Sequence, residues 1–167
     1  NPADEVIVTV GGSEAIDIGL RAMINPGDEV IIPQPSYVSY EPCAILAGAK
    51  PVIIDLKAEN EFRLTAEELE DVITDKSKVL ILPFPNNPTG AIMEREDLEK
   101  IAELIRKYDL YVISDEVYDY LIYEGKHISL KSLDQDGRVI LISGVSKKYA
   151  MTGWRIGYAI ASEEIIS

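Results

Sequence analysis

The sequence predicts an α/β fold built on a mostly parallel β-sheet. Short runs rich in β-branched residues alternate with segments whose apolar residues recur at helical spacing, as in successive βαβ units. One run, residues 79–82, is apolar at every position, as expected for a parallel strand covered on both faces. No helical segment separates the last two strand-like runs, residues 138–142 and 154–161, so the seventh strand is expected to run antiparallel.

The overall composition is that of an ordinary globular domain, with 167 residues, 47% of them hydrophobic and 27% charged. The apolar runs are the length of strands and no secretory leader is recognisable, so neither a membrane nor a secreted protein is predicted. The net charge of -13 argues against a nucleic-acid partner, because phosphate backbones attract an excess of lysine and arginine. The single cysteine, Cys43, cannot form an internal disulfide, which fits the reducing cytoplasm.

The first predicted strand, residues 5–10, ends at a Gly-Gly-Ser turn that opens a helix. The backbone N–H groups at the start of a helix, together with the positive end of its dipole, favour an anion. Gly12 and Ser13 are therefore candidate phosphate ligands, and Ser13 is also expected to be the N-cap. A plain helix cap with no ligand is the alternative interpretation of these residues.

The second strand, residues 29–32, ends in the segment Pro-Gln-Pro-Ser-Tyr, where two prolines exclude a helix. The last residue of that segment, Tyr37, offers a flat aromatic face for stacking, although a core tyrosine is the simpler alternative. A short helix through residues 44–47 and a third strand, residues 51–56, follow. Residues 65–68 then form a capping box at the start of another helix.

Polar segments follow the next two strands at their carboxyl ends, where open α/β sheets bind ligands. After strand 79–82 comes Asn-Pro-Thr-Gly, a good turn sequence in which Asn87 is a candidate ligand-binding residue. An amphipathic helix over residues 94–105 leads to strand 111–114 and then to Asp115, whose carboxylate is suited to pairing with a cationic ring nitrogen.

Strand alternation predicts that Glu116 points away from Asp115, provided that the strand continues that far. The segment that follows, residues 119–137, is predicted to be a mixed loop. His127 lies in this loop and is predicted to be a surface residue, because no second ligand or base flanks it. No metal site is predicted.

Cations gather in residues 143–158, between the last two strands. A lysine at the end of a buried strand is costly unless it is paired or covalently used, because desolvation disfavours its charged form and lowers its pKa. Lys147 is therefore a candidate nucleophile. Arg155, eight residues on, adds a rigid fork that binds phosphate, so the two side chains together suit a phosphorylated aldehyde. The alternative is a pair of solvated loop lysines and a surface arginine.

The run Ser146-Lys147, followed by Thr152-Gly153-Trp154-Arg155 and Gly157-Tyr158, resembles the pyridoxal-phosphate lysine motif of class I and II aminotransferases, the aspartate and aromatic aminotransferase family. The resemblance implies a three-layer, fold-type I large domain, with a seven-stranded, mostly parallel sheet that has one antiparallel strand and helices on both sides. It covers residues 1–167 and corresponds to the central large domain of longer proteins. We therefore expect an excised cofactor-binding domain that lacks an N-terminal arm and a C-terminal small domain.

By this resemblance, Lys147 forms the Schiff base with pyridoxal 5'-phosphate, Asp115 pairs with the ring nitrogen and Tyr118 binds the phenolic oxygen, and these are the catalytic residues. Asn87 is implied in binding both the cofactor and the substrate, with a cis bond to the proline that follows. One departure is Gly144, where many members of the family have a phosphate-binding serine. The implied cofactor-binding set is Gly12, Ser13, Tyr37, Asn87, Asp115, Tyr118, Lys147 and Arg155.

The resemblance implies transfer of an amino group between an amino acid and a 2-oxo acid by a cytoplasmic homodimer. Carbon–sulfur lyases of the same fold share these residues, and some transcriptional regulators carry an aminotransferase-like sensor domain, so both remain alternatives. The substrate's side-chain pocket and a carboxylate-binding arginine lie outside these residues in the family. The chain alone is therefore expected to bind the cofactor poorly, to be inactive and to expose an apolar patch.

Overall fold

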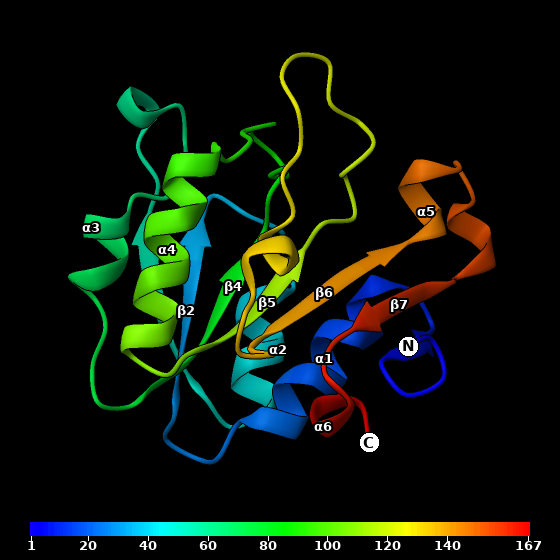
Figure 1. Cartoon of the computed structure of the whole chain (residues 1–167), viewed down its shortest axis with the longest axis horizontal. Helices are drawn as coiled ribbons and strands as arrows, with labels where there is room; N and C mark the ends of the chain where they lie inside the picture. The colour runs from blue at the N-terminus through cyan, green and yellow to red at the C-terminus, as the bar shows by residue number, and fades with distance from the viewer.

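The computed structural model describes all of residues 1–167 and confirms the predicted fold class (Figure 1). Seven strands form one sheet in the order β1-β7-β6-β5-β4-β2-β3. The strands are β1 (Val6–Thr9), β2 (Glu29–Gln34), β3 (Lys50–Asp55), β4 (Ser77–Leu82), β5 (Tyr111–Asp115), β6 (Val139–Gly144) and β7 (Gly157–Ile160).

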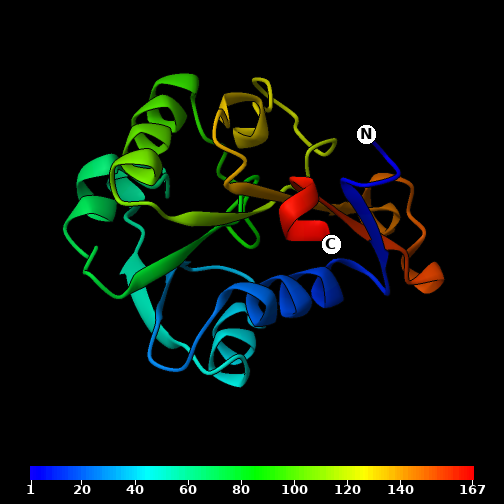
Figure 2. The same ribbon diagram turned by 60° about the horizontal axis from the view of Figure 1, so that its bottom comes forward.

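Helices cover both faces of the sheet, which makes three layers (Figure 2). Helices α3 and α4 pack on one face, and α1 and α2 pack on the other. No helix is long and apolar enough to cross a membrane. The helices are α1 (Gly12–Met23), α2 (Tyr40–Leu46), α3 (Ala66–Glu70), α4 (Arg95–Lys107), α5 (Val145–Lys148) and α6 (Glu163–Ile166), with 3-10 turns η1 (Ala58–Asn60), η2 (Leu130–Leu133) and η3 (Thr152–Trp154).

Each central strand contributes to two separate hydrophobic cores because successive side chains point to opposite faces of the sheet. In β4, Val79 and Ile81 join the core beneath α1 and α2, whereas Leu80 and Leu82 join the core beneath α3 and α4. All four side chains are buried. Residues 79–82 therefore form a parallel strand that is covered on both faces, as the continuous apolar run predicted.

Strand β7 runs antiparallel to both of its neighbours, β6 and β1, and the other adjacent strand pairs are parallel. The expected antiparallel seventh strand is confirmed. Because its direction is reversed, β7 begins at the edge of the sheet where the other strands end. Residues just before β7 therefore reach the same edge as residues just after β4, β5 and β6.

Several elements have other bounds than expected: α2 begins at Tyr40 rather than at residue 44, and β7 begins at Gly157 rather than at residue 154. Strand β2 does not end at Ile32 but continues to Gln34 along β3, and Pro33 is tolerated because pairing with β4 has already stopped at Ile31. Ser13 is not the N-cap of α1, because Gly11, with φ of 78°, turns the chain earlier and Gly12 is already helical. The predicted capping box of α3, from Thr65 to Glu68, is confirmed.

Three glycines let the ends of β6 and β7 approach the turn between β1 and α1. A Cβ on Gly157 would overlap the backbone of Gly11, and a Cβ on Gly144 would lie 2.9 Å from the carbonyl oxygen of Ile156. A side chain at position 144 would therefore require this backbone to shift. The approach brings Arg155 against Gly11, where a Cβ would overlap its guanidinium group.

Replacing Gly157 with alanine is expected to lower the free energy of unfolding by about 1–3 kcal/mol, because the added methyl group meets backbone that cannot move aside. Gly153→Ala is the matched control, since nothing lies within 4 Å of the position of its Cβ. Urea unfolding of both variants measures the effect. Equal midpoints for the two would show that the close approach at Gly157 is not a constraint.

Candidate active site

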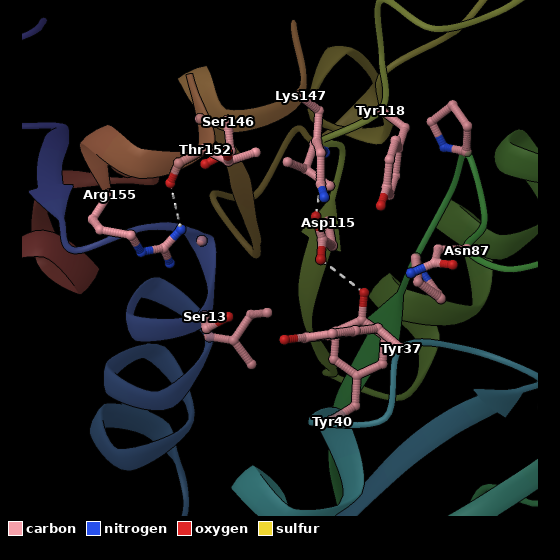
Figure 3. A pocket seen from close by; sticks show the side chains of 16 residues that line it. Ser13, Tyr37, Tyr40, Asn87, Asp115, Tyr118, Ser146, Lys147, Thr152 and Arg155 are labelled. Atoms are coloured by element: carbon pink, nitrogen blue, oxygen red, sulfur yellow. Dashed lines mark hydrogen bonds between the residues drawn. The ribbon is translucent and has the colours of Figure 1, made fainter. Parts of the chain in front are cut away.

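A cavity of about 280 Å³ opens at the edge of the sheet where β4, β5 and β6 end. Side chains from the turn that opens α1, from the proline segment after β2 and from the segments after β4, β5 and β6 line it (Figure 3). Every residue in the cofactor-binding set predicted from the sequence lines this one cavity. Those residues are Gly12, Ser13, Tyr37, Asn87, Asp115, Tyr118, Lys147 and Arg155.

Lys147 lies on α5, the single helical turn that follows β6. Its side chain reaches down into the cavity toward Asp115, with Tyr118 beside it (Figure 3). The Nζ atom lies 5.6 Å from the centroid of the Tyr118 ring. Contrary to the burial assumed from the sequence, Lys147 is exposed, because α5 carries it past the end of the sheet. It forms no ion pair with a carboxylate.

Asp115 ends β5 at the floor of the cavity and is buried. The Tyr40 hydroxyl donates a hydrogen bond to Oδ2 at 2.7 Å, and the Val117 N–H donates to Oδ1 at 3.2 Å. Burial raises the pKa of the Asp115 carboxyl, and the two hydrogen bonds offset part of that rise. No lysine or arginine pairs with it, so Asp115 is a buried acid without a cationic partner.

Tyr40, on the first turn of α2, was not predicted as a site residue. Burial, followed by the nearby Asp115 carboxyl, raises the pKa of its phenol well above the usual value, so the hydroxyl keeps its proton and donates a hydrogen bond to Asp115. Tyr37 lies three residues earlier, in the proline segment before α2, so no helical spacing in the sequence linked the two tyrosines. The two rings meet edge to face with centroids 5.6 Å apart.

Tyr37 forms one wall of the cavity near Ser13 (Figure 3). The Ser39 hydroxyl, and to a lesser extent the Ser13 hydroxyl, lower the pKa of the Tyr37 phenol. Its edge-to-face contact with Tyr40 fixes the plane of the ring. Tyr37 therefore presents a held aromatic surface to the cavity, as stacking requires.

Hydroxyl groups and one cation gather at the end of the cavity away from Asn87 (Figure 3). Ser13, Ser146 and Thr152 supply the hydroxyls, and the last two were not in the predicted set. Arg155 supplies the cation; its Nη1 atom donates a hydrogen bond to the Thr152 carbonyl at 3.2 Å. Arg155 forms no ion pair, so this end of the cavity carries an uncompensated positive charge that suits a phosphate.

Asn87 lies at the opposite end, on the turn after β4. The predicted cis bond between Asn87 and Pro88 is confirmed. Asn86 holds the turn, since its Oδ1 atom accepts hydrogen bonds from the backbone N–H and the hydroxyl of Thr89, at 3.2 and 2.9 Å. The amide of Asn87 is exposed and free to bind a ligand.

The prediction for His127 was wrong. Its side chain is 17% exposed rather than on the surface, and its Nε2 atom lies 2.6 Å from Oε2 of Glu116. Glu116 points away from the cavity, as strand alternation predicted, and is itself buried. The histidine was misjudged because its partner lies 11 residues earlier in the chain and no local pattern links the two.

Replacing Tyr40 with phenylalanine is expected to leave Oδ2 of Asp115 without a donor while the ring packing is kept. Losing a hydrogen bond to a buried carboxylate should lower the free energy of unfolding by about 1–3 kcal/mol at neutral pH. The difference should shrink when Asp115 is protonated at low pH. Chemical unfolding at both pH values measures it, and an equal loss at both would assign the effect to packing alone.

The amino-acid sequence was compared with protein families and with known proteins. The family model described as aminotransferase class I and II matches residues 1–167. An aspartate aminotransferase from Pyrococcus abyssi is 48% identical over 99% of this chain, and aromatic-amino-acid aminotransferase 2 from Thermococcus litoralis is 46% identical over 99%. The chain covers 43% of each of these proteins, so it spans less than half of their length.

Solved structures have the same fold, and this chain again matches less than half of each of them. The crystal structure of an aromatic aminotransferase from Pyrococcus horikoshii OT3 has a TM-score of 0.97 and 47% identity, over 99% of this chain and 45% of that one. An aspartate aminotransferase from Thermus thermophilus, solved with maleate, has a TM-score of 0.95 and 41% identity, over 98% of this chain and 42% of that one. The chain described here belongs to the class I and II aminotransferase family.

Proposed function

We propose that residues 1–167 are the pyridoxal-phosphate-binding large domain of an aminotransferase, which moves an amino group between an amino acid and a 2-oxo acid. One observation carries the proposal. A buried acid without a cation, Asp115, and a cation without an anion, Arg155, line one cavity, and an unpaired amine, Lys147, reaches into it as well. A ligand with a cationic ring nitrogen, a phosphate and an aldehyde satisfies all three.

The residues present fit this cofactor by their chemistry. Gly12, whose backbone lies at the start of α1, and the hydroxyls of Ser13, Ser146 and Thr152 would hold the phosphate together with Arg155. The close approach allowed by the glycines keeps this cradle narrow, since a side chain at position 11 would occupy the place of the guanidinium group. We assign the stacking surface to Tyr37, and the binding of the phenolic oxygen to Asn87 and Tyr118.

When bound, pyridoxal phosphate supplies an electron-accepting ring that stabilises negative charge at the substrate Cα. Asp115 would keep the proton on the ring nitrogen, and Tyr40 would hold Asp115 in place. Lys147 would anchor the cofactor covalently and, once released by the incoming amino acid, take the Cα proton as a general base and return it as an acid. Asn87 would orient the carboxylate end of the substrate.

We further propose that the domain acts within a longer homodimeric protein. Six large apolar side chains on two neighbouring segments are exposed beside the cavity, and Lys148 packs over Tyr120 and Tyr149 where the segments meet. An exposed surface of this kind is typical of a contact with another domain or subunit. We call it the aromatic patch: Tyr120, Leu121, Tyr123, Tyr149, Met151 and Trp154.

The direct test is a product assay on a longer protein that carries this chain, with pyridoxal phosphate, an amino acid such as aspartate and 2-oxoglutarate. Formation of glutamate in step with the loss of the amino donor is expected. Release of pyruvate and ammonia from a β-substituted amino acid without any acceptor would instead assign the carbon–sulfur lyase reaction. No reaction of either kind would contradict an enzymatic function.

The 167-residue chain on its own is expected to transfer amino groups no faster than free pyridoxal phosphate does, because substrate positioning contributes much of the catalysis. A single-turnover mixture of the chain, pyridoxal phosphate and aspartate measures this rate. A rate close to that of a competent enzyme would show that the substrate site lies within these residues.

A further inference from the structure

A buried polar cluster lies next to the cavity, on the other side of the end of β5, and the proposed reaction does not use it. At its centre is the Glu116 carboxylate, whose side chain is 4% exposed. Oε1 accepts hydrogen bonds from the hydroxyls of Ser114, at 3.0 Å, and Ser129, at 2.8 Å, and Oε2 lies 2.6 Å from Nε2 of His127. Taking Glu116 as a carboxylate, which can only accept, we assign the proton of this contact to Nε2.

No lysine or arginine pairs with Glu116, so these three donors alone compensate its burial. They come from two places in the chain. Ser114 precedes Glu116 in β5, whereas His127 and Ser129 follow it by 11 and 13 residues. The carboxylate therefore ties the return of a long loop to the point from which the loop departs.

That loop, residues 117–126, has no regular secondary structure and carries exposed side chains at Tyr120, Leu121 and Tyr123. Its departure is fixed to the sheet, because the Glu116 N–H donates to the Ile142 carbonyl at 2.9 Å. Figure 1 shows it rising above the sheet between β5 and η2. Besides the contacts of Lys148 with Tyr120 and Asp119, the hydrogen bonds at the base of the loop restrain its conformation.

The loop also carries Tyr118 into the cavity. The Asp119 N–H donates to the Glu116 carbonyl at 2.9 Å, and the Leu121 N–H donates to the Tyr118 carbonyl at the same distance, so Tyr118 sits within a turn that starts from Glu116. Its ring then lies against Lys147, with the Nζ atom 5.6 Å from the ring centroid. A shift at the base of the loop would move this ring.

We propose that Glu116 and His127 form a clasp that closes the 117–126 loop and thereby positions Tyr118 against Lys147. Both are positioning residues, which act through Tyr118 and do not touch the substrate. The role toward Tyr118 rests on the proposed function, whereas closure of the loop does not. Asp115 and Glu116 are adjacent in sequence but point to opposite sides of the end of β5: Asp115 lines the cavity, and Glu116 holds the loop.

The first test is hydrogen exchange of the 167-residue chain without cofactor. In His127→Ala the amides of Asp119 and Leu121 should exchange about 10- to 100-fold faster, the range expected from losing a hydrogen bond to a buried charge. His127→Gln, whose amide nitrogen can take the place of Nε2, should restore most of the protection, and Lys126→Ala, an exposed neighbour, should change nothing. Unchanged exchange in His127→Ala overturns the clasp.

The second test uses saturating pyridoxal phosphate and the pH midpoint of the absorption band of the lysine-bound cofactor. His127→Ala should shift this midpoint in the same direction as Tyr118→Phe, and the double variant should show no additional shift, because both act through one hydroxyl. Additive shifts, or no shift in a variant whose loop amides exchange faster, overturn the positioning role. Failure of the unaltered chain to attach the cofactor to Lys147 would count against the proposed function instead, and the exchange result would still decide the clasp.

Discussion

Replacing Lys147 with alanine is expected to abolish covalent attachment of pyridoxal phosphate to this chain. In the unaltered chain, added cofactor should produce a new absorption band, and borohydride reduction should fix the label on one lysine. Lys147 is the lysine that lines the cavity, whereas the ammonium of Lys148 lies over the rings of Tyr120 and Tyr149 and is 3.9 Å from Asp119. Peptide mapping by mass spectrometry locates the label.

Lys148→Ala is the matched control, because it removes an equivalent amine one residue away and should leave labelling intact. In a longer, active protein, Lys147→Ala should also remove the group that carries the Cα proton, with a loss of about 10²–10⁴-fold in turnover from proton transfer alone. Labelling of Lys148, or of many lysines to the same extent, would contradict the assignment.

Asp115→Asn is expected to weaken cofactor binding and, at the same time, to stabilise the cofactor-free chain. The variant keeps the shape of the side chain but loses the charge that would pair with a ring nitrogen, and a hydrogen bond to a charged group is worth about 10- to 100-fold in affinity. Without cofactor, however, the buried carboxylate has no cation nearby, so removing its charge should raise the free energy of unfolding at neutral pH by about 1 kcal/mol.

The pH dependence follows from the direction of the pKa shift. Because burial raises the pKa of Asp115 in the folded state, the folded chain holds its proton to higher pH than the unfolded chain does. Below the unfolded pKa of about 3.9 both states are protonated and the variant has no advantage. As the pH rises from there through the folded-state pKa, the unaltered chain loses stability relative to Asp115→Asn.

Thermal unfolding from pH 3 to pH 8 measures this difference, and cofactor titration measures the affinity. Asp136→Asn serves as the control, because its side chain is exposed and it forms no ion pair. A variant that is less stable than the unaltered chain at neutral pH would show that the carboxylate is compensated in the folded state.

The predicted cofactor-binding residues could be identified from the sequence because a general property of α/β sheets places them together. Asn87 and Lys147 follow strands and Asp115 ends one, and the carboxyl ends of parallel strands meet at one edge. The exposure of Lys147 was not predicted, because α5 adds a helical turn beyond the strand. A turn of four residues leaves no apolar pattern in the sequence.

The hydrogen-bonded partners could not be predicted in the same way. Tyr40 bonds to Asp115 across 75 residues, and His127 bonds to Glu116 from a loop without periodicity. Such contacts depend on how helices and loops are placed against the sheet. The residues would have the same local propensities without these contacts, so the propensities do not reveal them. The glycine at position 144 was visible in the sequence, but the Ile156 carbonyl oxygen, which would lie 2.9 Å from a Cβ there, was not.

Because β7 runs antiparallel to β6, the length of the connection between these two strands affects the geometry of the proposed cofactor site. Since β6 ends and β7 begins at the same edge, the seven residues from 148 to 154 are the whole span between Lys147 and Arg155, the two proposed anchors of the cofactor. An insertion or deletion there would change the distance between two anchors of a single small molecule. The 117–126 loop also contacts Lys148 through Tyr120, but its tip near Tyr123 is exposed, so natural and engineered length variation should accumulate at that tip and be excluded from the shorter turn.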